Sequence, residues 1–182
     1  STNPTPVTVT KNEMVLITGG KFKMGRDAGE NVPPAEQPAH EVEIKGFWMD
    51  KTEVTNAEYY EFVKETGYQP PSHFTGGRVA TGEELLPVVR VSMDDVKAFI
   101  KWRSKRDGIN YRLPNEKEWE FSARNGDSNN LYPWGDNWED ERAAVEIKAF
   151  REVGSYPNGK NKWGVLDLIG NVWEWTSSEI VE

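Results

Sequence analysis

The stretch that decides the fold is Gly170-Asn171-Val172-Trp173-Glu174-Trp175, near the carboxyl end of the printed sequence. Two indoles flank a single carboxylate, and a Gly-Asn turn leads into them. Side chains of an extended segment alternate between its two faces. We therefore expect residues 172–175 to form a strand in which Trp173 and Trp175 seal a core, while Glu174 points to the opposite side, beside Asn171.

The same stretch leaves two interpretations of Glu174 open. An Asn and a Glu three residues apart, next to the carbonyls of a tight turn, are hard oxygen donors of the kind that Ca²⁺ prefers. Alternatively, Glu174 is solvated or pairs with an arginine, because one carboxylate makes a weak calcium site. The spacing alone favours the solvated or arginine-paired carboxylate over the calcium ligand.

Bulk composition excludes several classes of function. The 182 residues suit one domain with a real core. Lys and Arg number 22 against 30 Asp and Glu, and the net charge of −8 argues against nucleic-acid binding. No apolar run approaches the roughly 18 residues that a transmembrane segment needs. The count of zero cysteines excludes disulfides, thiolate metal sites and cysteine nucleophiles within this sequence.

Residues 1–12 form a polar leader without the apolar stretch of a signal peptide, so we expect the folded domain to occupy residues 13–182.

His40 and His73 are the only histidines. We expect His40 to be satisfied or exposed beside a strand, and His73 to lie at the surface in a proline-rich loop. We find no pattern that activates a nucleophile, and we predict no catalytic residue here.

Three helices are predicted, because in each case the signal for a helix start, an apolar face and the signal for a helix end agree. Each start pairs a capping side chain with a carboxylate three residues later, and each stop is a glycine. The pairs are Thr55 with Glu58, Ser92 with Asp95, and Asn115 with Glu118; the glycines are Gly67, Gly108 and Gly126.

Strands are predicted with fewer signals. Residues 14–18 and 22–24 flank Gly19-Gly20, which is typical of a hairpin-like turn. Residues 42–44 alternate apolar and acidic side chains, as a half-exposed strand does. The long loops carry Tyr and Trp side chains that can pack, so we expect ordered loops and an α+β fold.

The chain resembles the formylglycine-generating-enzyme (sulfatase-modifying factor) family along nearly its whole length. The blocks that carry the resemblance are residues 14–25, 40–44 with 47–56, 87–92, 111–120, 132–135 and 164–175. The resemblance implies a single, loop-rich α+β domain with the C-type-lectin-like architecture, a few short strands and about three helices.

What the resemblance implies about chemistry is limited by the cysteine count. The family's founding members oxidise a substrate cysteine to formylglycine with a cysteine pair and copper, both located downstream of the Trp173–Trp175 block. This sequence has no cysteine, so copper is not expected. It ends at Glu182, just after that block, so the resemblance implies a family domain without its C-terminal part. Relatives bind calcium, which implies Asn171 and Glu174 as ligands, with carbonyls at Val172 and Gly170. Arg112 is expected to brace loop carbonyls or the Glu174 region, and Trp119 to anchor the third helix.

Two functional hypotheses follow. The first is a non-catalytic binding or scaffold domain with a protein or peptide partner, at an exported, periplasmic or cell-surface location. The alternative is the N-terminal portion of a formylglycine-generating oxidoreductase whose cysteines lie beyond residue 182.

Overall fold

The computed structural model describes residues 12–29, 32–145 and 148–178. The predicted leader therefore lies outside the described residues, apart from Asn12. The elements are β1 (Met14–Ile17), β2 (Gly20–Met24), β3 (His40–Ile44), β4 (Phe47–Asp50), α1 (Asn56–Thr66), α2 (Met93–Asp107) and α3 (Glu116–Ala123), joined by loops that hold short 3-10 turns.

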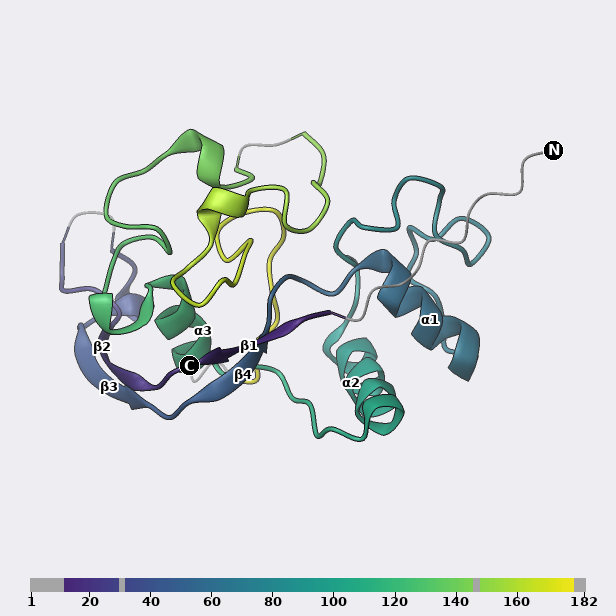
Figure 1. The fold of residues 1–182 in the computed structure, drawn as a ribbon, viewed down its shortest axis with the longest axis horizontal. Helices are drawn as coiled ribbons and strands as arrows, with labels where there is room; N and C mark the ends of the chain where they lie inside the picture. Colours follow the sequence, from purple (N-terminus) through teal and green to yellow (C-terminus); the bar gives the residue numbers. More distant parts are fainter. Residues whose placement is uncertain (1–11, 30–31, 146–147, 179–182) are drawn as a thin grey trace.

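The molecule has two parts, which Figure 1 separates clearly. We call residues 56–107, with α1 and α2, the helical wing. The strands, α3 and the loops of residues 116–178 form the other part, which we call the body. Short connections on either side of the wing join the two parts (Figure 1).

The three helices begin at the predicted caps. The side chain of Thr55 accepts a hydrogen bond from the N–H of Glu58, and Ser92 and Asn115 each form a complete capping box. Such caps satisfy main-chain donors that a helix start otherwise leaves open. Gly67 and Gly108 end α1 and α2 in the left-handed conformation, as predicted.

The predicted stop of α3 at Gly126 is wrong, because the helix ends at Ala123. The next residue, Arg124, donates hydrogen bonds to the carbonyls of Lys23 and Gly25 on and after β2. These tertiary bonds turn the chain before it reaches the glycine. Gly126 instead begins a 3-10 turn, with the ring of Trp163 packed against it.

The predicted hairpin around Gly19-Gly20 is also wrong. β1 pairs with β4 and β2 pairs with β3, both antiparallel and in the same register. The two ladders are therefore successive parts of one bent, two-stranded ribbon, and the bend lies at Gly19, between β1 and β2. A Cβ atom at Gly19 would lie 2.3 Å from the carbonyl oxygen of Ile44 at the end of β3. The predicted strand at residues 42–44 is confirmed as part of β3.

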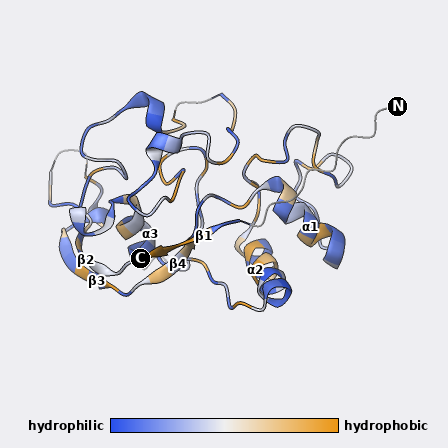
Figure 2. Cartoon of the chain, viewed as in Figure 1, coloured by the Kyte–Doolittle hydropathy of each residue, from blue (hydrophilic) through white to orange (hydrophobic). Residues whose placement is uncertain are grey.

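Each part has its own core. In the body, the buried apolar side chains are Ile17, Phe22, Ile44, Phe121, Ala123, Val165 and Leu168. In the wing they are Tyr59, Phe62, Val63, Phe74, Phe99 and Trp102. Figure 2 shows the corresponding hydrophobic colour on β1 and on one side of α2, with hydrophilic residues along the outer loops.

The prediction that Trp173 and Trp175 seal a core is wrong. Residues 172–175 form no strand, Trp173 is 102% exposed and Trp175 is 48% exposed. The segment follows two left-handed residues, Gly170 and Asn171, and among the described residues no bridge pairs residues 172–175 with another segment. Without a neighbouring strand to pair with, alternation alone cannot bury the indoles.

The expectation of aromatic-pinned loops is confirmed where the structure describes them. Tyr132 stacks on Trp134 at 5.4 Å between ring centroids, and Trp138 packs edge-on against Tyr132 at 5.3 Å.

Among the described residues, no helix combines the length and the apolar character that crossing a bilayer requires.

Candidate functional site

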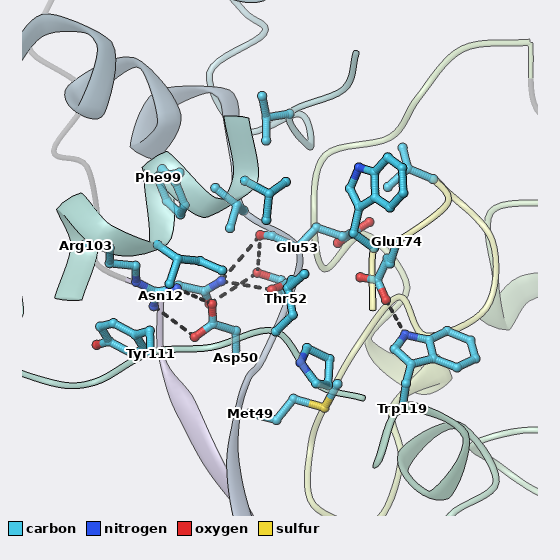
Figure 3. A pocket seen from close by; sticks show the side chains of 18 of the residues that line it. Asn12, Met49, Asp50, Thr52, Glu53, Phe99, Arg103, Tyr111, Trp119 and Glu174 are labelled. Carbon is cyan, nitrogen blue, oxygen red and sulfur yellow. Dashed lines mark hydrogen bonds and ion pairs between the residues drawn. The ribbon is translucent and has the colours of Figure 1, made fainter. Parts of the chain in front are cut away.

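A pocket of about 1360 Å³ lies between the wing and the body. Its walls come from β4, from α1 and α2, and from the segment around Trp173. The lining includes Phe47, Trp48, Met49, Asp50, Glu53, Tyr59, Phe99, Arg103, Tyr111, Trp119, Asn171, Trp173, Glu174 and Trp175. Figure 3 shows ten of the lining residues by name, with Asp50, Thr52 and Glu53 on one side of the space and Trp119 with Glu174 on the other.

Asn171 holds one wall of the pocket together by hydrogen bonds. Its side-chain N–H groups donate to Glu53 Oε1 at 2.8 Å and to the carbonyl of Arg151 at 3.2 Å. Its side-chain oxygen accepts from the N–H of Arg151 at 3.0 Å, and its own N–H donates to the carbonyl of Ala144. The residue thus joins three segments that are far apart in the sequence.

Glu53 is a buried carboxyl group in the wall of the pocket. It is 9% exposed, and its Oε2 atom is buried without a hydrogen-bond partner among the described residues. Burial, followed by the nearby carboxylates of Asp167 and Glu174, raises the pKa of Glu53 to about 8. A buried carboxyl group next to two others has little basis for ionising at neutral pH.

Glu174 lies across the pocket from Glu53, beside Trp119 (Figure 3), and close enough for its charge to act on Glu53. Its carboxylate accepts a hydrogen bond of 2.5 Å from the indole N–H of Trp119. The residue as a whole is exposed, but its carboxylate sits among the atoms of the pocket wall. This loss of solvation, with the charge of Asp167 added, raises the pKa of Glu174. Arg112 binds Glu118 and the carbonyl of Leu113, so it braces a loop carbonyl, as one of its two predicted roles requires, and no hydrogen bond or ion pair joins it to Glu174.

Of the predicted calcium ligands, Asn171, Val172 and Glu174 line the pocket, whereas Gly170 is not among its lining residues. Gly170 and Asn171 form the turn against Ala144, Val172 lines the pocket, and the Asn171 oxygen already accepts the Arg151 N–H. No group of three or more His, Cys, Asp or Glu side chains in the described residues is arranged to hold a metal. Hard oxygen donors are nevertheless present at Glu174 and Glu53, and calcium binding stays a prediction.

A buried ion-pair network forms the opposite wall, where the wing meets β4. Arg103, 4% exposed, donates to both carboxylate oxygens of Asp50 at 2.5 and 2.9 Å. Glu58, 2% exposed, lies 3.4 Å from Arg103 and 3.1 Å from Arg106. The Arg103 guanidinium also stacks over the ring of Tyr111. This arrangement fixes the pocket wall and is structural.

Sequence reasoning found Asn171 and Glu174 but missed Glu53, Asp167 and the Arg103 network. The sequence contains one usable signal: Asp167 is a carboxylate set within an otherwise apolar stretch, residues 165–169. The histidines do not join the site. His40 is exposed, whereas His73 is half-buried against Asn56 rather than at the surface as predicted, because the Pro70–Phe74 loop folds under α1.

Comparison with known proteins gives the family. The model of the sulfatase-modifying factor enzyme 1-like domain matches residues 1–181. The chain belongs to this family. Its loop-rich α+β fold is accordingly that of a formylglycine-generating-enzyme-like domain, as predicted.

Three similar proteins illustrate the family. The inactive C-alpha-formylglycine-generating enzyme 2 of Mus musculus is 33% identical over 91% of this chain and 68% of its own length. The formylglycine-generating enzyme of Mus musculus is 30% identical over 97% of this chain, which spans only 60% of that enzyme. The structure of PvdO from Pseudomonas aeruginosa is 32% identical, with a TM-score of 0.76, over 91% of this chain and 70% of that one.

Proposed function

We propose that this sulfatase-modifying factor domain is a non-catalytic binding or scaffold domain that recognises a protein or peptide partner. The observation that carries the proposal is a large open pocket in a family domain whose sequence contains no thiol. The thiolate is the nucleophile and copper ligand in cysteine chemistry, so the chain has no group for that role. One family member similar to it bears the name of an inactive enzyme.

The test is an assay for formylglycine. The chain is incubated with a peptide that carries the sulfatase cysteine motif, in air and with added copper, and aldehyde is detected by hydrazide labelling and mass spectrometry. We expect no aldehyde above the level of a protein-free control. Aldehyde formed by the chain alone would overturn the proposal.

One observation favours the alternative, an oxidoreductase of which this sequence is the N-terminal portion. Trp173 and Trp175 are exposed next to the pocket, where further polypeptide could cover them. The discriminating measurement is the intact mass of the native protein, together with the encoding DNA after residue 182. Cysteines encoded there would establish the alternative, and a stop codon or a cysteine-free extension would remove it.

Calcium is proposed as the bound ion of the Glu174 wall, supported by oxygen donors that lack a cationic partner among the described residues. Glu174 would hold the ion, with main-chain carbonyls at Gly170 and Val172. Ca²⁺ would neutralise the carboxylates there. Ligand binding to the folded state raises stability by about 2.7 kcal/mol at a hundredfold excess over Kd, so calorimetry should show a higher Tm with Ca²⁺. Glu174→Gln should remove the shift, and an unchanged Tm in the parent chain would reject the ion.

We also propose an exported, periplasmic or cell-surface location, where millimolar calcium would saturate a weak site. Fractionation of the source cells with an antibody to this chain tests it. Recovery of the chain with cytoplasmic markers would contradict it.

A further inference from the structure

Three lysines form a row along the outward side of α2. Lys97, Lys101 and Lys105 follow one another at intervals of four residues, which is slightly more than one helical turn. Neighbouring lysines therefore lie about 6 Å apart along the helix axis, and the row is about 12 Å long. All three side chains are exposed, whereas the apolar residues that α2 buries belong to the core of the wing. We call this row the lysine stripe.

The lysine stripe is not neutralised within the part of the chain that the structure describes. None of its lysines forms an ion pair or a side-chain hydrogen bond with a described residue. The two arginines of α2 differ, because Arg103 pairs with Asp50 and Arg106 pairs with Glu58. Asp94, an exposed carboxylate of α2, lies in the first turn, where the helix N-terminus stabilises a negative charge.

The lysine stripe works against the stability of its own helix. Like charges four residues apart on a helix repel and destabilise it. The exposed charges of the other two helices follow the opposite pattern. Lys64 of α1 pairs with Glu61, and Arg124 at the end of α3 pairs with Glu120. Helix stability therefore does not explain why α2 carries three lysines in a row.

The lysine stripe lies apart from the pocket and from the last described residues. None of its three lysines lines the pocket between wing and body. Ser177 and Ser178 bind Pro114 and the start of α3 in the body, whereas α2 belongs to the wing (Figure 1). Exposed ammonium groups also need no apolar cover for the chain to fold. An anionic partner is what they complement.

The distribution of charge limits the size of that partner. The wing contains eight basic and eight acidic residues, so the whole net charge of −8 falls on the rest of the chain. A nucleic acid or an anionic membrane extends far beyond 12 Å and would also meet this negative charge, which repels it. A short anionic segment that covers only α2 avoids the repulsion. The structure therefore favours a short acidic stretch of polypeptide.

We propose that the lysine stripe of α2 binds an acidic segment of a partner polypeptide, with one carboxylate opposite each lysine. Glu or Asp at every fourth position of a helix repeats at about 6 Å, and at alternate positions of an extended chain at about 7 Å. Both repeats match the stripe. Exposed ion pairs of this kind contribute mainly to specificity and to the rate of association, and salt weakens them. The inference rests on the binding role proposed above and adds a surface and a partner chemistry to it.

The probes are three fluorescein-labelled sixteen-residue peptides of one composition, Glu with Ala and Gln. Their glutamates stand at every fourth position, at alternate positions, or in one block. Kd is measured by anisotropy at low and at physiological ionic strength. We expect at least one of the two spaced peptides to bind at least fivefold more tightly than the block peptide, and its Kd to rise with salt.

Matched variants assign the binding to the stripe. The triple variant Lys97→Glu, Lys101→Glu and Lys105→Glu should raise the Kd of the spaced peptide at least tenfold, and Lys101→Gln alone about threefold. The control replaces three other exposed lysines by Glu, which changes the net charge equally and should leave Kd within threefold: Lys45, Lys117 and Lys160. Thermal unfolding checks that each variant folds.

The outcomes that overturn the inference are distinct. Equal Kd values for the two triple variants, or no binding of any peptide at low ionic strength, would reject the stripe as a site. Tighter binding to phosphatidylserine vesicles or to a DNA duplex would reject an acidic polypeptide as the occupant. Salt-sensitive self-association in sedimentation, lost with the stripe, would identify a second copy instead. Aldehyde formation in the separate assay would remove the non-catalytic function without affecting peptide binding.

Discussion

At the scale of single residues, the site depends on backbone conformations that few side chains tolerate. Gly170 has φ of 88° and Asn171 has φ of 58°, and both turn against Ala144. Asn is among the few non-glycine residues that adopt this region readily. The conformation of the Gly-Asn pair therefore places the Asn171 side chain where it binds both Glu53 and Arg151.

Gly170→Ala is expected to destabilise the fold by about 3 kcal/mol or more. The added Cβ would lie 2.4 Å from the carbonyl oxygen of Ala144, in addition to the strain of the left-handed backbone. Gly164→Ala is the matched control: its φ is 95° but nothing lies within 4 Å, so only the backbone cost of about 1–2 kcal/mol remains. Urea unfolding measures both, and equal losses would contradict the close-approach argument.

His73 gives a prediction of pH dependence. Its Nε2 lies 3.0 Å from Asn56 Oδ1, which accepts because the Asn56 amide nitrogen donates to the carbonyl of Glu83. The proton is therefore on Nε2, and Nδ1 is buried without a partner among the described residues. Burial, with Arg90 adding to it, lowers the pKa of His73.

Because the folded pKa is below the unfolded value of about 6.5, the unfolded state binds the proton first. Stability is therefore lost as pH falls through about 6.5. His73→Gln keeps a donor to Asn56 and should reduce the difference in urea midpoint between pH 7.5 and pH 5.5. His40→Gln, at an exposed imidazole, should leave that difference as in the parent chain. An unchanged slope in the His73 variant would refute the assignment.

At the scale of elements, local signals and tertiary bonds act together in α3. This helix of eight residues begins with the Asn115–Glu118 capping box, and Glu118 also binds Arg112 through two hydrogen bonds of 2.7 Å. Its Trp119 carries the hydrogen bond to Glu174. The cap thus positions part of the pocket wall.

Asn115→Ala should cost about 1 kcal/mol of stability, the usual value of a lost N-cap. It should also shift the fluorescence of Trp119, which the cap holds against Glu174. Lys117→Ala, on an exposed position of the same helix, should change neither quantity. Thermal unfolding followed by fluorescence tests both, and equal behaviour of the two variants would exclude the capping role.

At the scale of the whole molecule, the wing and the body are joined by buried charge. Arg103 of α2 pairs with Asp50 of β4, and Glu58 of α1 joins them. Desolvation of such groups is costly, and the pairing offsets it only while all members are present. The network therefore fixes the position of the wing relative to the β-ribbon and the width of the pocket.

Arg103→Met should cost about 3 kcal/mol, because it removes the bidentate partner of the half-buried Asp50 carboxylate and leaves the buried Glu58 with Arg106 alone. Adding Asp50→Asn to this variant should recover part of the loss by removing one of those charges. Lys101→Met, exposed on the same helix, is the control. Denaturant unfolding gives the free energy of unfolding of the parent chain and the three variants. A loss below about 1 kcal/mol for Arg103→Met would show that the network contributes little to stability.

The sequence by itself determined the family and the helix starts, because each depends on residues that are neighbours in the chain. Caps at Ser92 and Asn115 act within three residues. Tertiary structure decided the pairing of β1 with β4, the end of α3 and the meeting of Glu53 with Asn171. It also decided that Trp173 lies in solvent, because burial requires a partner surface, and alternation along one segment does not specify one.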